Sequence, residues 1–306
     1  MKTANDIDTG IGIFYIPFAY LYHVRLRKVD KLLSWIGLLL LPTLSYFVFS
    51  LPDTYSTGVQ IGSYILLWLM IVPYYELGYM YNDTYTTQHE SAPSLRLNTV
   101  LTDYFYRHVG KIYLTRLVYV LCLLLAFEWL NSWSAQAVLA GGWTALLLPV
   151  FQVYNHIRGL KAVCLYPILV SWRYVPFLLY HYGSQHWWTL LAFLLLTYPI
   201  EISIERFSMP KHRYKGIRWL IPDEAAKQSF RVWYYAICIV VLSVICPLLT
   251  IPHTALLPFY ALYLYRFLRL WKEIGWTALF TTKWWKHAII ILLTAVWVMG
   301  ICLQYL

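Results

Sequence analysis

Long apolar segments separated by short polar ones run along almost the whole chain. A helix needs about 20 mostly apolar residues to cross a membrane. Nine segments meet this requirement: Leu32–Ser50, Gln60–Met80, Ile112–Leu130, Ala135–Tyr154, Ala162–Tyr182, Trp187–Ile204, Val232–Thr250, Thr254–Leu270 and Ala288–Leu306. The pattern therefore predicts an all-α membrane protein, with nine transmembrane helices in one bundle and a single membrane domain over residues 1–306.

The composition agrees with this pattern. The chain is 60% hydrophobic and 12% charged, whereas about 25% of the residues of a soluble protein are charged. Residues 1–31 precede the first apolar segment, and the stretch from Ile11 to Arg27 is apolar at its start and basic at its end. Such a stretch is typical of a helix lying in the membrane interface. We therefore expect an N-terminal interfacial segment, with membrane lipid as the surrounding solvent.

The basic residues predict how the chain is oriented. They collect in the N-terminal segment and in the loops after the second, fourth, sixth and eighth apolar segments. The short loops between the other segments, Leu51–Val59, Asn131–Ser134, Gly183–His186 and Ile251–His253, contain no Lys or Arg. Because cytoplasmic loops are enriched in Lys and Arg, the N-terminus is expected in the cytoplasm and the C-terminus on the opposite side.

This orientation also accounts for most of the formal charge of +10, so nucleic acid is not an expected partner. The predicted location is a bacterial inner membrane. Two cytoplasmic loops are long, Asn82–Lys111 and Arg206–Arg231. Long polar loops usually carry function or disorder, and these two predict a cytoplasmic cap of short helices. The five cysteines all lie in apolar runs without a CxxC pair, which favours neither a disulfide framework nor a zinc site.

Acidic residues gather at the end of the second apolar segment. Glu76 and Asp83 are seven residues apart, so they share a helix face. Asn82, Thr86 and Glu90 are four apart and line one stripe if the helix continues that far. Because carboxylates at membrane depth are costly, they are functional candidates.

A second acidic pair ends the sixth apolar segment. Glu201 and Glu205 are one helical turn apart and point the same way. Two carboxylates at this spacing repel each other unless a cation or base lies between them. Oxygen ligands of this kind suit Mg²⁺, which usually takes one or two carboxylates with water and substrate phosphates. The alternative is that the carboxylates are solvated, or paired with Arg206 or Lys211.

Together these two motifs resemble those of the UbiA superfamily of intramembrane prenyltransferases, which has nine transmembrane helices. That family has a motif NDxxDxxxD after its second helix and DxxxD after its sixth. The chain has Asn82-Asp83-x-x-Thr86-x-x-x-Glu90 and Glu201-x-x-x-Glu205 at these places. The basic stretch from Tyr154 to Lys161 and the residue Arg96 are also similar to basic positions of the family. Thr86 departs from the pattern, because the family has Asp there, and Glu90, Glu201 and Glu205 also take the place of Asp.

The resemblance implies an enzyme that transfers an isoprenyl group from an isoprenyl diphosphate to a lipophilic or aromatic acceptor within the membrane. Mg²⁺ ions held by acidic and amide side chains would bind the diphosphate, and basic side chains would neutralise its other oxygens. The implied metal ligands are Asn82, Glu90, Glu201 and Glu205, with Asp83 as a further catalytic residue, and the implied diphosphate contacts are Arg96, Arg158 and Lys161.

Two further intramembrane residues are candidates for the site, and three other functions are alternatives to the transferase. Glu76 and Arg173 lie within apolar segments and are expected to face the bundle. A terpene cyclase of the UbiA type would use the same diphosphate site. A non-catalytic isoprenoid or lipid binder, or a transporter, is the alternative favoured by Thr86. The enzyme hypothesis requires the carboxylates after the second and sixth segments to face each other across one cavity.

Overall fold

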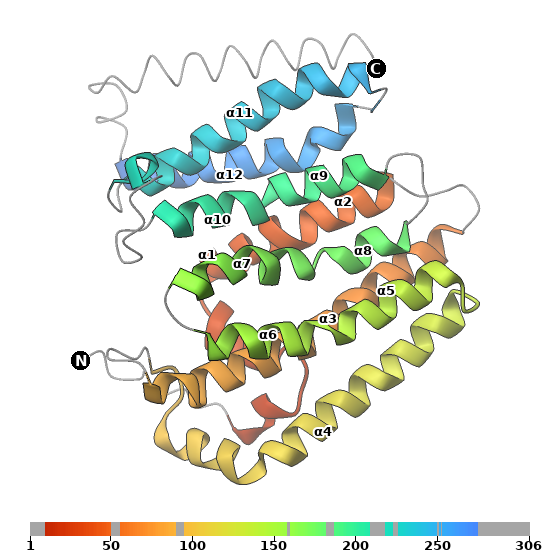
Figure 1. Ribbon diagram of the computed structural model, residues 1–306, viewed down its shortest axis with the longest axis vertical. Coiled ribbons are helices and arrows are strands. Elements are labelled where there is room, and N and C mark those ends of the chain that lie inside the picture. Colours follow the sequence, from red (N-terminus) through yellow and green to blue (C-terminus); the bar gives the residue numbers. More distant parts are fainter. Residues whose placement is uncertain are drawn as a thin grey trace. The chain divides into compact units, whose positions relative to one another are not determined.

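The computed structural model describes residues 10–49, 56–89, 95–157, 160–181, 187–208, 218–222, 226–249, 251 and 253–274. Within these ranges the regular structure is entirely helical, as the apolar pattern predicts (Figure 1). The chain divides into two compact units. Unit 1 comprises Met1–Ile36 and Ser50–Phe193, and unit 2 comprises Gly37–Phe49 and Leu194–Leu306. Each unit is described by itself.

Unit 1 is built around the long helix α3. Its helices are η1 (Ile11–Phe14), η2 (Leu21–Leu26), α1 (Val29–Trp35), α3 (Thr57–Thr84), η4 (Thr86–His89), α4 (Thr99–Leu130), α5 (Ala135–Ala145), α6 (Leu147–His156), α7 (Leu160–Trp172), α8 (Val175–Tyr180) and the first part of α9 (Trp187–Thr197). Helix α3 packs against α4, α5 and α6. Leu67, Met70, Leu77 and Met80 of α3 are therefore completely buried.

Unit 2 combines an early segment of the chain with its C-terminal part. Its helices are most of η3 (Ile36–Leu40), α2 (Leu41–Phe49), the end of α9, α10 (Pro199–Ser208), η6 (Arg218–Leu220), α11 (Ala226–Leu248), η7 (His253–Leu256) and α12 (Leu257–Ile274). Helix α11 packs against α12 and α10, and α2 packs against α12. The tyrosines of α11 help to join the unit, since the Tyr235 hydroxyl donates to the Thr197 carbonyl at 2.6 Å.

Three apolar segments expected as single helices are each divided in two just before a proline. The breaks fall at Leu146, at Arg173 and Tyr174, and at Tyr198, ahead of Pro149, Pro176 and Pro199. Proline lacks the N–H that would bond to the carbonyl four residues earlier, and its ring clashes with that carbonyl. Pro73, Pro167 and Pro247 lie inside helices that continue through them.

Six helical stretches are long and apolar enough to cross a membrane: Thr57–His89, Thr99–Leu130, Ala135–His156, Lys161–Tyr180, Trp187–Ser208 and Ala226–Leu248. They coincide with the second to seventh predicted segments, and they indicate a multi-pass membrane protein. Leu32–Ser50 and Thr254–Leu270 are largely helical where described but are not among these six, and Ala288–Leu306 lies outside the described residues. The count of nine helices and the orientation stay predictions.

The first long loop contains more helix than the sequence predicts. Helix α4 begins at Thr99, well before the expected start at Ile112, and the Asn98 side chain caps it by accepting from the Leu101 amide at 2.8 Å. Helix α3 ends at Thr84 and is followed by the short turn η4. The α-helical stripe expected to run from Asn82 to Glu90 is therefore interrupted, and Glu90 lies outside the described residues.

The N-terminal segment differs from the single interfacial helix expected between Ile11 and Arg27. It forms two short helices, η1 and η2, on either side of Phe18, whose φ of 71° lies in the left-handed region. Buried side chains of the segment, among them Phe14 and Tyr20, share a core with Met80 and Phe105. The segment thus packs against α3 and α4 with part of its apolar side chains buried, whereas Ile11, Ile16, Phe18 and Tyr22 are exposed.

The packing of α3 against α6 can be tested at Gly78. A Cβ atom added there would lie less than 3.0 Å from the Phe151 ring, whereas a Cβ atom at Gly142 in α5 would meet nothing within 4 Å. We expect Gly78→Ala to destabilise the protein by about 1–3 kcal/mol because the core must move. Gly142→Ala should stabilise it by about 0.5–1 kcal/mol, as alanine does in helices. Thermal unfolding in detergent measures both, and equal melting temperatures for the two variants would contradict this packing.

Candidate functional site

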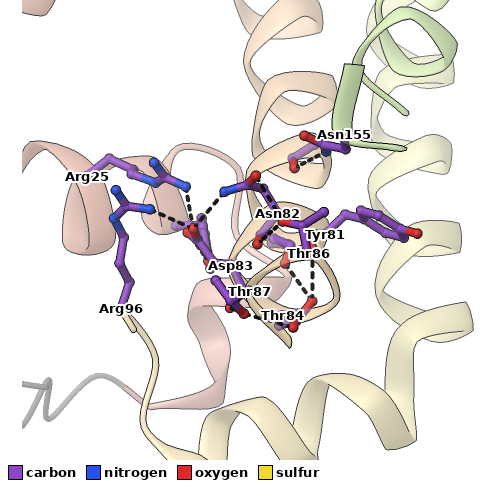
Figure 2. A network of polar contacts seen from close by, with 12 residues as sticks. Arg25, Tyr81, Asn82, Asp83, Thr84, Thr86, Thr87, Arg96 and Asn155 are labelled. Carbon is purple, nitrogen blue, oxygen red and sulfur yellow. Dashed lines mark hydrogen bonds and ion pairs between the residues drawn. The ribbon is translucent and has the colours of Figure 1, made fainter. Parts of the chain in front are cut away.

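The carboxylate of Asp83 is the centre of a polar cluster in unit 1. Its side chain is completely buried, and both of its oxygens accept hydrogen bonds. Oδ1 accepts from Arg25 Nη2 at 2.5 Å and from Arg96 Nη1 at 2.8 Å, as Figure 2 shows. Oδ2 accepts from the Tyr20 hydroxyl at 2.9 Å. One carboxylate therefore holds two guanidinium groups.

Three separate elements bring these groups together. Asp83 lies in the last turn of α3, Arg25 lies on η2, and Arg96 precedes α4. The Arg25 guanidinium also lies 4.3 Å from the centre of the Tyr79 ring, one turn before Asp83 on α3. Burial lowers the pKa of the Arg25 guanidinium, but the Asp83 carboxylate together with the nearby Tyr79 and Tyr20 outweighs burial, and the pKa is raised. Arg25 therefore stays protonated, as a buried cation beside a carboxylate does.

Tyr20 complements these cations as a neutral donor. Burial raises the pKa of its hydroxyl well above the usual value, and the nearby Asp83 carboxylate raises this pKa further. The hydroxyl keeps its proton at neutral pH and donates it to Asp83. The cluster consequently contains one negative and two positive groups.

Asn82 and Thr86 interact mainly with each other at the end of α3. The Thr86 hydroxyl donates to the Asn82 side-chain oxygen at 3.0 Å and also to the Asn82 backbone carbonyl (Figure 2). The Asn82 amide nitrogen donates weakly to Asp83 Oδ1 at 3.4 Å. Thr86 thus satisfies a carbonyl at the helix end, which is a common use of Thr side chains.

Glu76 lies seven residues before Asp83 on α3. Both carboxylates contact the N-terminal segment, which agrees with the shared helix face that their spacing predicts. Its carboxylate accepts from the backbone amides of Phe18 at 2.9 Å and Leu21 at 2.8 Å. The Arg116 guanidinium of α4 forms an ion pair with it, and both side chains are completely buried. Both oxygens of Glu76 are therefore engaged within unit 1.

The second cluster lies in unit 2 and surrounds Glu201 and Glu205 of α10. Arg231 of α11 contacts both carboxylates, with Nε 3.3 Å from Glu201 Oε1 and Nη2 2.7 Å from Glu205 Oε2. Lys227 Nζ lies 2.9 Å from Glu205 Oε1. Arg266 Nη2 of α12 lies 3.7 Å from Glu201 Oε1. The cation expected between the two carboxylates is thus supplied by an arginine side chain.

Each cluster has one more cation than carboxylates among the described residues. The first combines Asp83 with two arginines, and the second combines two glutamates with Lys227, Arg231 and Arg266. Each also keeps a buried guanidinium N–H with no hydrogen-bond partner in the described part of the chain, Arg25 Nε and Arg266 Nε, and in the second cluster both carboxylate oxygens of Glu201 lack a hydrogen bond as well. A positive balance with a spare donor suits an anionic group that accepts hydrogen bonds.

Neither cluster has the ligand set of a magnesium site when taken by itself. No group of three His, Cys, Asp or Glu side chains suited to a metal occurs among the described residues. The oxygens of Asp83 and Glu205 contact cations, and Asn82 accepts from Thr86. Magnesium prefers an octahedral set of oxygens. We therefore derive no chemical step through the metal from these contacts.

Of the remaining predicted site residues, two are described and two lie outside the described ranges. Arg173 lies at the break between α7 and α8 and is buried, with its guanidinium 5.3 Å from the Tyr75 ring centre and 5.4 Å from the Tyr174 ring centre. Lys161 is exposed near the start of α7. Glu90 and Arg158 fall outside the described residues.

Sequence reasoning missed several cations of these clusters. Arg116 and Arg266 lie within predicted apolar segments, so the rule that singled out Arg173 would have found them as well. Arg25 and Arg231 have no such signal, because each lies in a basic stretch that the positive-inside rule already explains. Only the folded chain shows that their charges are turned toward carboxylates.

Comparison of the chain with models of known protein families, with curated proteins and with solved structures finds no match in any of the three. The resemblance to the UbiA superfamily therefore stays a prediction based on the two motifs. The expectation that the two carboxylate groups share one cavity also stays a prediction, because they belong to units that are described separately.

The role of Arg231 in unit 2 leads to a stability prediction. Arg231→Met would leave the buried Glu201 and Glu205 one turn apart without the cation between them. Removing one partner of a buried ion pair costs about 3–5 kcal/mol. We expect a lowered melting temperature in detergent, partly restored by adding Glu205→Gln. Lys272→Met, at an exposed lysine in the last turn of α12, serves as the control. A melting temperature equal to that of the control would refute this role.

Proposed function

We propose that this chain is an intramembrane prenyltransferase of the UbiA type. It would bind an isoprenyl diphosphate and transfer the isoprenyl group to a lipophilic or aromatic acceptor within the membrane. Three features support the proposal. The chain has six apolar helices long enough to cross a membrane. It carries altered forms of both acidic motifs, and buried carboxylates of each motif lie beside a surplus of cations.

The surplus of cations beside buried carboxylates is the observation that carries the proposal. A diphosphate is a multiply charged anion with many acceptor oxygens, and guanidinium groups bind such oxygens through paired N–H donors. Asp83 holds Arg25 and Arg96 side by side by accepting from both. The carboxylates of the motif would then serve to orient arginines as well as to balance their charge.

The arrangement suits heterolytic cleavage of an allylic C–O bond. The bond breaks with both electrons going to the diphosphate, which leaves an allylic cation on the isoprenyl chain. Cations already fixed near the leaving group stabilise its developing negative charge, and such electrostatic stabilisation is usually the largest catalytic term. A nucleophilic carbon or oxygen of the acceptor then bonds to the cation and loses a proton to water.

Magnesium remains part of the proposal through the resemblance alone. When bound, it would supply further positive charge for the diphosphate oxygens. The described contacts of each unit do not fit a magnesium site, so its requirement is decided by assay. Dependence of binding or turnover on Mg²⁺, abolished by a chelator, is the expected behaviour.

A non-catalytic isoprenoid or lipid binder is the second candidate. The observation in its favour is Thr86, which takes the place of an acid in the first motif and bonds to Asn82. A binder would retain the cationic clusters without the chemistry. A terpene cyclase would use the same diphosphate site and would release a cyclised product with no acceptor.

The proposal predicts that Arg96 contributes to diphosphate binding. We expect Arg96→Gln to weaken the binding of farnesyl diphosphate about tenfold or more, because a hydrogen bond to a charged group is worth about 1.5–3 kcal/mol. The matched control is Arg107→Gln, since Arg107 is an exposed arginine on α4. Binding to the detergent-solubilised protein is measured with and without Mg²⁺, and release of inorganic diphosphate is followed in parallel.

The outcomes separate the candidates. Release of inorganic diphosphate with formation of a prenylated acceptor supports the transferase, and release with a cyclised hydrocarbon supports the cyclase. Binding without release identifies the non-catalytic binder. Absence of binding by the unaltered protein, with Mg²⁺ present, removes the proposal.

A further inference from the structure

The backbone of the N-terminal segment is bound by two charged side chains, Arg116 and Glu76. Arg116 of α4 donates to three carbonyls of the segment, those of Ile13 at 3.2 Å, Phe14 at 2.9 Å and Ile16 at 2.9 Å. Glu76 of α3 accepts from the amides that follow, those of Phe18 and Leu21. Five backbone groups are therefore bound by one ion pair.

These backbone groups need external partners because the segment is irregular. Between η1 and η2 the chain passes through Pro17 and Phe18, and the φ of 71° at Phe18 interrupts any continuous helix. Buried carbonyls and amides outside regular structure must find side-chain partners, since each unpaired one carries a desolvation cost. Arg116 has five N–H donors and no acceptor, so it suits the carbonyls in the first half of the segment. Glu76 has two acceptor oxygens, so it suits the amides in the second half.

The same contacts determine where Tyr20 and Arg25 lie. The Leu21 amide bonded to Glu76 is at the first residue of η2, directly after Tyr20. Arg25 lies on η2, four residues after Leu21. Glu76 and Asp83 occupy the same face of α3, so binding the start of η2 at Glu76 directs its later residues toward Asp83.

We propose that Glu76 and Arg116 form a clamp, whose role is to position Arg25 and Tyr20 against Asp83 in the diphosphate site. The inference deepens the proposed function, and the part that concerns the diphosphate rests on it. Glu76 and Arg116 are positioning residues here, because they act through the N-terminal segment.

A purely stabilising ion pair is the competing explanation, and it makes a different prediction. Buried ion pairs can often be replaced by apolar side chains without loss of stability. Here the replacement would leave the backbone groups of residues 13–21 without partners, so its effect should be concentrated in that segment. A general loss of stability would instead affect α3 and α4 along their whole length.

Hydrogen–deuterium exchange of the full-length protein in detergent tests the clamp without any substrate. We expect Glu76→Gln to raise the exchange rates of the Phe18 and Leu21 amides about tenfold or more, because a neutral amide replaces the carboxylate that binds them. Arg116→Lys should loosen the same segment to a smaller extent, since lysine retains the charge but has fewer donors. Glu128→Gln is the matched control, because Glu128 is another buried acid, on α4, and it should leave the segment unchanged.

The second measurement is the dissociation constant for farnesyl diphosphate. In Glu76→Gln we expect this dissociation constant to rise about tenfold or more, with a smaller rise in Arg116→Lys and no change in Glu128→Gln. If the Glu76 variant does not fold, a pair of substitutions at the partly exposed Phe18 tests the clamp instead. Phe18→Gly tolerates the positive φ and should bind normally, whereas the β-branched Phe18→Val does not and should bind more weakly.

The two measurements fail in distinguishable ways. If the unaltered protein does not bind farnesyl diphosphate, the proposed function fails, and the exchange experiment alone then decides whether the clamp holds the segment. If the unaltered protein binds but the Glu76 and Phe18→Val variants bind equally well, the clamp is refuted and the proposed function stands. Unchanged exchange of residues 10–26 in Glu76→Gln refutes the clamp in either case.

Discussion

The ion pair between Glu76 and Arg116 has no contact with solvent, and the N-terminal half of unit 1 is arranged around it. A buried charge is tolerated only when a partner and hydrogen bonds replace the water it has lost. Here many of the hydrogen bonds that replace water come from the backbone. Three carbonyls accept from Arg116, and two amides donate to Glu76. The requirement to solvate two charges therefore folds an irregular segment onto α3 and α4.

The same requirement explains both acidic motifs. Asp83 is surrounded by Arg25, Arg96 and Tyr20, and Arg231 lies between the carboxylates of α10. In an apolar protein each acid must be neutralised locally, and arginine does so with a planar set of donors that can serve two carboxylates at once. Because cations outnumber acids in each cluster, neutralisation leaves a residual positive charge with unsatisfied N–H donors. That residual charge is what makes an anionic substrate chemically reasonable.

Much of the helical layout could be predicted from the sequence. Where the prediction differs from the structure, the difference has an identifiable physical cause. Six of the predicted segments coincide with apolar helices because hydrophobic length is a local property of the chain. The breaks before Pro149, Pro176 and Pro199 follow from proline chemistry, yet Pro73 lies in an unbroken helix, so composition alone does not tell which prolines break. The apolar pattern predicts a start at Ile112, later than the actual start of α4 at Thr99. The first turns of α4 are polar, so hydrophobicity does not reveal that they are helical.

By itself the sequence determined the helical class, most of the apolar spans and the positions of the acidic residues. It also determined that Glu76 and Asp83 share a face, since helical spacing is local geometry. Only the tertiary structure decided which cations meet these carboxylates. Arg25 is 58 residues from Asp83, and Arg116 is 40 from Glu76. Contacts at such separations depend on how helices pack and on where a segment without regular structure finds partners for its backbone, and no local pattern of residues encodes either.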